Sequence, residues 1–134
     1  MSIFVEDSDN VEISVHYVEE NGKVIVHEEP VVGAKTIKMV FRRPDFSMSQ
    51  RIMATSTVTD QNGNQTINLM MLQNNLMYYL AKSWDIKTPD SKDAEGKVIP
   101  GKPVEFNSEN IGKLKIEIAR AVVNKLVENI GQIM

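Results

Sequence analysis

The side chains best suited to metal chemistry are two histidines followed by acidic residues. His16 and His27 are the two histidines of the chain, and Glu28 and Glu29 come directly after His27. A site built from two histidines and one carboxylate needs all three ligands to converge on one open position. Strand alternation turns His16 and His27 toward one face and Glu28 toward the other. The pattern therefore predicts a surface histidine pair, with no metal site and no cofactor.

No other motif predicts catalysis. The loop from Asp60 to Asn64 is similar in composition to a calcium-binding loop, but the glutamate required at the last coordinating position is missing. The chain has no phosphate-binding loop, no dinucleotide-binding glycine motif and no nucleophile elbow. It contains no cysteine, which excludes a thiolate nucleophile or ligand. We therefore expect no catalytic residue and no enzymatic activity.

Composition indicates an ordinary soluble domain. The chain has 134 residues, an apolar fraction of 42% and a formal charge of −3, which gives no support for neutralisation of nucleic-acid phosphates. No apolar run approaches the roughly 20 residues that span a bilayer. The first ten residues carry acids and no base, unlike a targeting peptide. These features predict an intracellular protein that binds neither nucleic acid nor membrane.

Charge is unevenly distributed along the chain. Residues 1–34 contain eight acidic residues and one basic residue, whereas residues 35–43 contain four basic residues and no acid. One interpretation is a solvated acidic hairpin beside a basic strand. The other is an acidic surface that steers a basic partner toward the protein.

The elements that position these residues begin with a predicted β-hairpin. Val11 to Glu20 alternates apolar and polar residues, Asn21-Gly22 follows, and Lys23 to Glu28 forms a second apolar run. Asn-Gly between two such runs predicts a two-residue turn with positive φ at both positions. That turn would pair Glu20 with Lys23, Val18 with Ile25, and His16 with His27. Lys35 to Arg43 is predicted as a third strand, with Ile37, Met39 and Phe41 on one face.

Helices are predicted for most of the remaining chain. Ser47 and Gln50 match a capping box at the start of a helix from about Met48 to Thr57. A polar loop at 60–64 leads to a long apolar helix from about Gln65 to Trp84. Residues 87–106 are predicted to be irregular, with brief pairing of 97–99 with 103–106. Asn107 or Ser108 caps a final helix that runs to about Ile130 and ends at Gly131.

The helix predicted at 65–84 is apolar on more than one side, and it carries methionines, tyrosines and the only tryptophan. Such a helix is either buried in its own domain or covered by a partner. The helix 108–130 and the strand residues Ile37, Met39 and Phe41 can bury it. A binding groove or oligomer seam is the alternative, for which the candidate interface residues are Met70, Met71, Met77, Tyr78 and Trp84.

Taken together, these elements predict an α+β fold in one domain over residues 1–134. Its N-terminal part, residues 1–43, is an antiparallel hairpin with a third strand. The part from 44 to 134 is predicted to be helical, with about three helices packed on the sheet and an irregular loop at 87–106.

From Phe41 onward the chain resembles the small tail assembly chaperones of tailed bacteriophages. The shared pattern runs through Phe41-Arg42-Arg43-Pro44-Asp45-Phe46, the helix stop Lys82-Ser83-Trp84-Asp85-Ile86, the run Lys97-Val98-Ile99-Pro100, and the capped helix at Asn107-Ser108-Glu109-Asn110-Ile111. The N-terminal acidic hairpin departs from the mainly helical members of this family. The resemblance covers about residues 41–130.

The resemblance implies a non-enzymatic protein of the host cytoplasm. Such a chaperone binds helical segments of the tape measure protein, keeps them soluble during tail assembly and tends to form homo-oligomers. The alternative is a structural subunit of the virion or tail that docks by adding its hairpin to the sheet of a neighbour. An enzyme is the third and least supported alternative, because no acid, base and nucleophile can be placed together.

Overall fold

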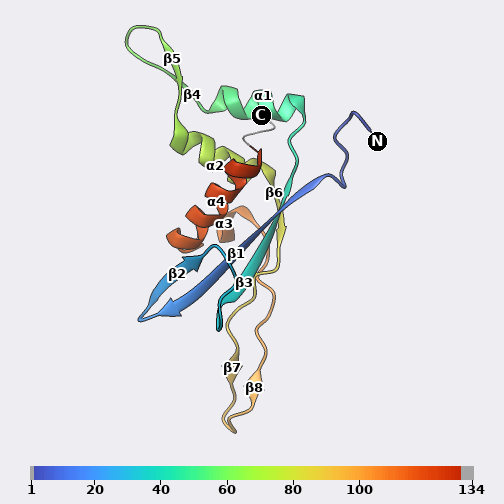
Figure 1. Ribbon diagram of the computed structural model, residues 1–134, viewed down its shortest axis with the longest axis vertical. Coiled ribbons are helices and arrows are strands. Elements are labelled where there is room, and N and C mark those ends of the chain that lie inside the picture. The colour runs from blue at the N-terminus through green and yellow to red at the C-terminus, as the bar shows by residue number, and fades with distance from the viewer. Residues whose placement is uncertain (1, 131–134) are drawn as a thin grey trace.

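The computed structural model of the protein describes residues 2–130 (Figure 1). Its centre is a four-stranded antiparallel sheet of order β2-β1-β3-β6, and helices cover one face of it. The predicted α+β fold is confirmed. The sheet strands are β1 (Asn10–Glu20), β2 (Lys23–His27), β3 (Lys35–Arg42) and β6 (Ala81–Trp84). The helices are α1 (Phe46–Thr55), α2 (Leu69–Leu80), α3 (Ser108–Ile111) and α4 (Ile116–Ile130).

The first hairpin has the predicted turn and register. Asn21 and Gly22 have φ values of 51° and 78°, the left-handed conformation that a two-residue turn of type I′ requires. Glu20 pairs with Lys23, and His16 pairs with His27. The Asn-Gly prediction is confirmed in each of these pairings.

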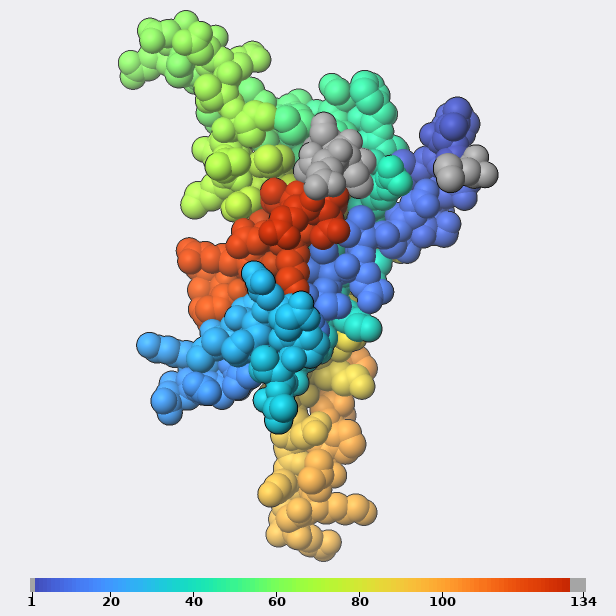
Figure 2. Space-filling model, in the orientation of Figure 1, coloured from blue at the N-terminus to red at the C-terminus, as the bar shows by residue number. Residues whose placement is uncertain are grey.

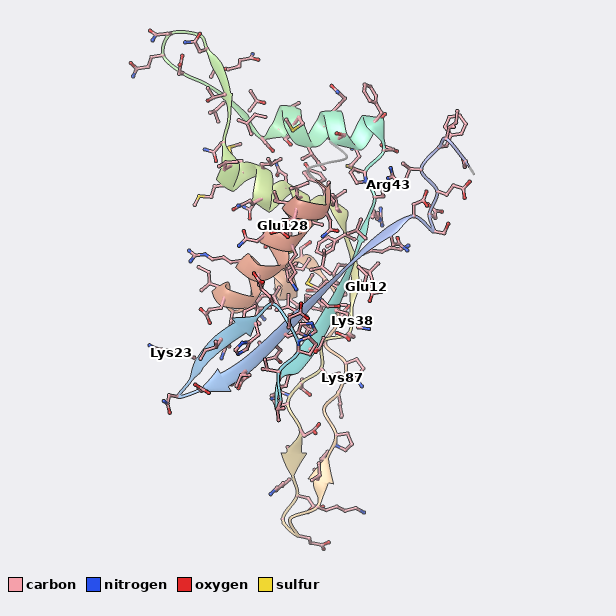
Figure 3. The ribbon with its side chains drawn as sticks, viewed as in Figure 1. Glu12, Lys23, Lys38, Arg43, Lys87 and Glu128 are labelled. Carbon is pink, nitrogen blue, oxygen red and sulfur yellow. The ribbon has the colours of Figure 1, made fainter. Side chains whose placement is uncertain are left out.

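Alternation along the sheet separates a buried face from an exposed one. Val15 pairs with Ile37 and Ile13 with Met39, so these side chains point toward the helices. On the opposite face, Glu12 and Lys38 are exposed and their charged atoms lie 3.7 Å apart (Figure 3). The buried face forms one hydrophobic cluster with residues of α1, α2, α3 and α4.

The start of α1 differs from the predicted capping box. The helix begins at Phe46 because the side chain of Asp45 accepts a hydrogen bond from the backbone N–H of Met48, at 2.8 Å. Asp45 is extended, with φ −81° and ψ 178°, as an N-cap residue requires. Ser47 lies inside the first turn, so the predicted capping role of Ser47 is wrong.

The long helix predicted at 65–84 is wrong at both ends. Asn68 caps α2, and Ala81 turns extended with ψ 133° after its N–H has bonded to the Met77 carbonyl. The chain then continues as β6, where Met39 pairs with Trp84 and Phe41 with Ala81. The predicted helix stop at Ser83-Trp84-Asp85 is therefore the end of β6, a strand at the edge of the sheet, and the residue that follows it.

Two further hairpins project from the body of the molecule (Figure 2). The first arm joins β4 (Thr57–Thr59) to β5 (Gln65–Ile67), and the second joins β7 (Ser91–Lys92) to β8 (Val98–Ile99). The polar loop at 60–64 is thus a hairpin tip rather than a link between helices. Pairing of 97–99 with 103–106 was predicted, but Val98–Ile99 pairs with Ser91–Lys92. Residues 44–130 are consequently less helical than predicted.

The C-terminal helix is interrupted near its start. Asn107 is the N-cap of α3, as predicted, and its side chain accepts from the N–H of Asn110 at 2.8 Å. Gly112 ends α3 after a single turn, and α4 begins at Ile116. Ile118, Val122, Leu126 and Ile130 of α4 are buried in the core. The predicted stop at Gly131 lies outside the described residues.

Candidate protein-binding surface

The orientation of α2 is fixed by its cap, its apolar side and one polar contact. Asn68 accepts from the N–H of Met71 at 3.0 Å, which sets the first turn. Leu76, Met77 and Leu80 are buried in the core. On the side facing α1, the amide of Asn75 donates to the fully buried hydroxyl of Ser56 at 2.9 Å.

These contacts leave a row of α2 side chains pointing to solvent, which we call the α2 stripe. It consists of Met70, Met71, Asn74 and Tyr78, whose spacing of three and four residues places them on one helix face. Met70 is 76% exposed, Tyr78 is 45% exposed and Met71 is 38% exposed. An exposed row of two methionines and a tyrosine is typical of a protein contact surface.

Other exposed apolar side chains lie near the start of α2. Leu69 is exposed in its first turn, on the side of the helix that carries the buried Leu76 and Leu80, and Ile67 is exposed at the end of β5. No residue of α2 carries a charge. The region therefore attracts an apolar partner and provides no charged group for chemistry.

Two of the five candidate interface residues lie elsewhere. Met77 is only 4% exposed and belongs to the core, so it is not available to a partner of the folded chain. Trp84 is half-buried on β6, where its indole N–H donates to the carbonyl oxygen of Val104 at 2.8 Å. Its ring packs edge-on against Phe106, with centroids 5.2 Å apart. The structure thus brings Met70, Met71 and Tyr78 together and separates them from the other two.

The histidine pair lies on the exposed face of the sheet rather than at a cluster of ligands. His16 and His27 are directly opposite each other, and Nδ1 of His16 lies 2.8 Å from the Thr36 hydroxyl. Within residues 2–130, no group of three or more histidine or carboxylate side chains is arranged to hold a metal ion.

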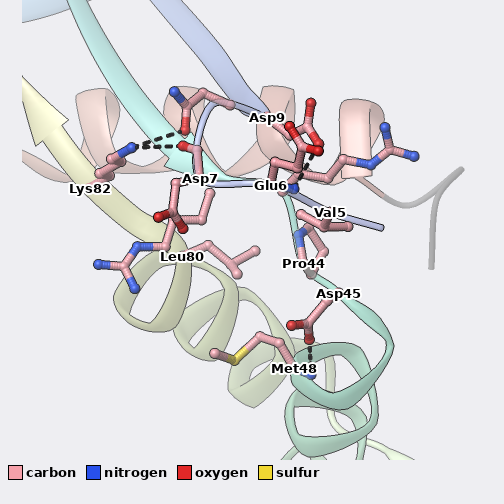
Figure 4. A pocket seen from close by; sticks show the side chains of 12 residues that line it. Val5, Glu6, Asp7, Asp9, Pro44, Asp45, Met48, Leu80 and Lys82 are labelled. Atoms are coloured by element: carbon pink, nitrogen blue, oxygen red, sulfur yellow. Dashed lines mark hydrogen bonds between the residues drawn. The ribbon is translucent and has the colours of Figure 1, made fainter. Parts of the chain in front are cut away.

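A hollow of about 460 Å³ lies where the N-terminal segment crosses the end of the sheet (Figure 4). Two of its carboxylates bind backbone groups: Asp45 caps α1, and Asp9 accepts from the N–H of Glu6 at 2.9 Å. The ammonium of Lys82 donates to the carbonyl oxygen of Asp7 at 3.1 Å. The contact of Lys82 holds the N-terminal segment against β6, and Glu6, Asp7, Arg42 and Arg43 line the rest of the hollow.

Two features of the surface were not predicted from the sequence: the exposed start of α2, and a groove between β2 and α4 that is lined by residues of both. Asn68 is a good N-cap residue placed directly before an apolar run, so it could have indicated the true start of α2. The groove had no comparable signal, because it arises from two elements that are almost 90 residues apart in the chain.

Among residues 2–130, no helix has the length and apolar character needed to cross a membrane. Comparison of the chain with protein-family models, with curated proteins and with solved structures gives no significant match.

Proposed function

We propose that this protein is a non-enzymatic bacteriophage tail assembly chaperone that binds helical segments of the tape measure protein in the host cytoplasm. The observation that carries the proposal is the α2 stripe, where Met70 and Tyr78 are exposed on one uncharged helix face. Flexible methionine side chains adapt to helices of different sequence, and a chaperone for a long helical client needs that adaptability.

The geometry suits a helix better than an extended strand as the occupant of the stripe. The exposed side chains follow one face of a twelve-residue helix, and a second amphipathic helix can pack along such a face by interdigitating its side chains. We also propose that the α2 stripe joins two copies of the chain in a homo-oligomer when no client is present. The client then binds by displacing the second copy from the stripe.

The experiment mixes the purified chain with a synthetic amphipathic segment of the tape measure protein and measures the mass of the complex by light scattering. We expect a complex with the wild-type chain and none with the double variant Met70→Asp, Tyr78→Asp. Val32→Asp is the matched control, because Val32 is fully exposed in the β2–β3 connection. Equal binding by the double variant would refute the α2 stripe as the client site.

The second candidate function is a structural subunit of the virion or tail that docks by its β-hairpin. It is favoured by one observation, the position of β2 at the edge of the sheet with pairing on one side only. Mass spectrometry of purified particles separates the two functions. A structural subunit is present at a fixed ratio to the other tail proteins, whereas a chaperone is absent from the finished particle.

A further inference from the structure

The outer edge of β2 carries backbone groups that point away from the sheet. Because the turn has two residues, Glu20 and Lys23 form the hydrogen-bonded pair beside it, and the pairs then alternate along the hairpin. Val24 and Val26 fall at the non-bonded positions, so their N–H and C=O groups face outward. β2 has no proline or bulge, which are two of the devices that usually protect an edge strand.

A groove of about 730 Å³ runs beside this edge, between β2 and α4. Val24 and Val26 supply its apolar wall from the strand, and Ala121 and the exposed Ile116 supply it from the helix. An edge strand next to an apolar groove is the arrangement that proteins use to bind an extended segment as an additional strand.

Carboxylates lie at the ends of the groove. Glu117 and Glu128 are both exposed and lie eleven residues apart on the groove side of α4, with Ala121 between them. That spacing is about 16 Å along the helix. Strand residues six positions apart share a face and lie about 20 Å from each other, so long basic side chains at these positions can reach both carboxylates. Figure 3 shows Glu128 on α4. Glu28 adds a third carboxylate from the strand side.

The basic residues of the groove balance these acids only in part. Lys125 donates to the carbonyl oxygen of Ser14, so its ammonium is already bound within the sheet. Arg120 is the other basic side chain that lines the groove. The hairpin itself adds Glu19, Glu20 and Glu29, against one basic residue, Lys23. The surroundings of the edge are therefore acidic, which disfavours a second copy of β2 and favours a basic strand.

We propose that the β2–α4 groove binds an extended segment of a partner protein as a fifth strand, with small apolar side chains in the middle and a basic side chain at each end. The central side chains lie against Val24, Val26 and Ala121, and the terminal ones pair with Glu117 and Glu128. This site is separate from the α2 stripe, so it stands whether or not α2 binds a helix.

The probe is a fluorescein-labelled heptapeptide with the sequence Lys-Thr-Val-Thr-Val-Thr-Lys, titrated with the full chain at low salt and followed by anisotropy. We expect saturable binding that weakens as salt is added. The double variant Glu117→Lys, Glu128→Lys should lower the affinity about tenfold, since two ion pairs become two repulsions. Glu95→Lys, Glu109→Lys makes the same change in net charge at exposed sites away from the groove and should change the affinity less than about twofold.

The backbone contact is tested on the peptide, so that folding of the protein is not in question. Residues opposite Val24 and Val26 share their face and form the hydrogen-bonded pairs with them. N-methylation of the two valines of the probe should therefore abolish binding, whereas N-methylation of two of its threonines should leave the affinity unchanged. The amide protons of Val24 and Val26 should exchange more slowly in the complex.

Three results would overturn the proposal. They are absence of binding by the wild-type chain, equal binding by the Glu117→Lys, Glu128→Lys variant, and a dimer in which the Val24 and Val26 amides are already protected without peptide. The last result would assign the edge to a second copy of the chain. Met70→Asp should leave peptide affinity unchanged, so failure of this site and failure of the proposed chaperone function remain distinguishable.

Discussion

The indole of Trp84 donates to the carbonyl oxygen of Val104 at 2.8 Å, and this bond joins the end of β6 to the base of the second arm. The neighbouring backbone strengthens the junction, because the N–H of Val104 donates to the Ile86 carbonyl at 2.9 Å. Phe106 packs edge-on against the indole. Trp84 thus joins the sheet to the segment that follows the second arm, through Val104 and Phe106.

Replacing Trp84 should therefore destabilise the fold in two separable steps. We expect Trp84→Phe to lower the free energy of unfolding by about 1 kcal/mol through loss of the indole hydrogen bond. Trp84→Ala should lower it by about 3 kcal/mol, because the contact with Phe106 is lost as well. Urea denaturation followed by circular dichroism measures both, with Phe46→Ala at an exposed position as the control. Equal effects of the two substitutions would show that the ring packing contributes little.

The contact between α1 and α2 depends on a buried hydroxyl. Ser56 donates to the Ile52 carbonyl at 2.6 Å and accepts from the amide of Asn75 at 2.9 Å. We expect Asn75→Ala and Ser56→Ala each to cost about 1 kcal/mol, and the double variant to cost less than their sum because both remove the same bond. A double-mutant cycle by urea denaturation measures the coupling. Strict additivity would mean that the two side chains do not interact in solution.

The same substitution should affect stability strongly at one methionine of α2 and very little at another. Met77 is 4% exposed and Met70 is 76% exposed. Met77→Asp should unfold the chain at room temperature, because it places a charge in the core without a partner. Met70→Asp should change the free energy of unfolding by no more than about 0.5 kcal/mol. Thermal melts of both variants make the comparison, and destabilisation by Met70→Asp would show that α2 is covered in the free protein.

The second arm has a close backbone crossing at its base. A Cβ atom at Gly101 would overlap the carbonyl oxygen of Thr88. The N–H of Gly101 also donates to the carboxylate of Asp90 at 2.7 Å. We expect Gly101→Ala to separate the two antiparallel segments of the arm. Trypsin should then cleave much faster at the lysines between residues 87 and 102. The core residues lie outside the arm, so the melting temperature should fall by only a few degrees. Gly112→Ala, at a φ of −66° and with the nearest atoms 3.4 Å from the added Cβ, is the control for the same substitution outside the arm.

Sequence predicted the parts of the fold that local chemistry determines. The Asn21-Gly22 turn fixed the register of β1 and β2, and alternation placed Ile37, Met39 and Phe41 in the core. Asn107 or Ser108 was predicted as a helix cap, and Asn107 is the cap, because such a side chain acts within one helical turn. In each case the signal and the structure it indicates lie within a few residues of each other.

The missed elements depend on residues far away in the chain. Ala81 to Trp84 continues the apolar spacing of α2, and only pairing with β3 makes it a strand. The arms have few apolar residues, so no alternation marks their strands. Among the candidate interface residues, exposure of Met70 and burial of Met77 depend on where α4 and the sheet end against α2. Helix periodicity alone placed Met70 and Met77 on the same face and predicted the same role for both.

The two arms also change how the protein moves through solution. A compact chain of 134 residues has a radius of gyration of about 14 Å, and hairpins that extend from the body must raise this value and increase friction with the solvent. A monomer of this shape will leave a sizing column early, at a volume that a compact dimer would share. Its stoichiometry must therefore be read from mass, by sedimentation equilibrium or light scattering, and never from elution volume.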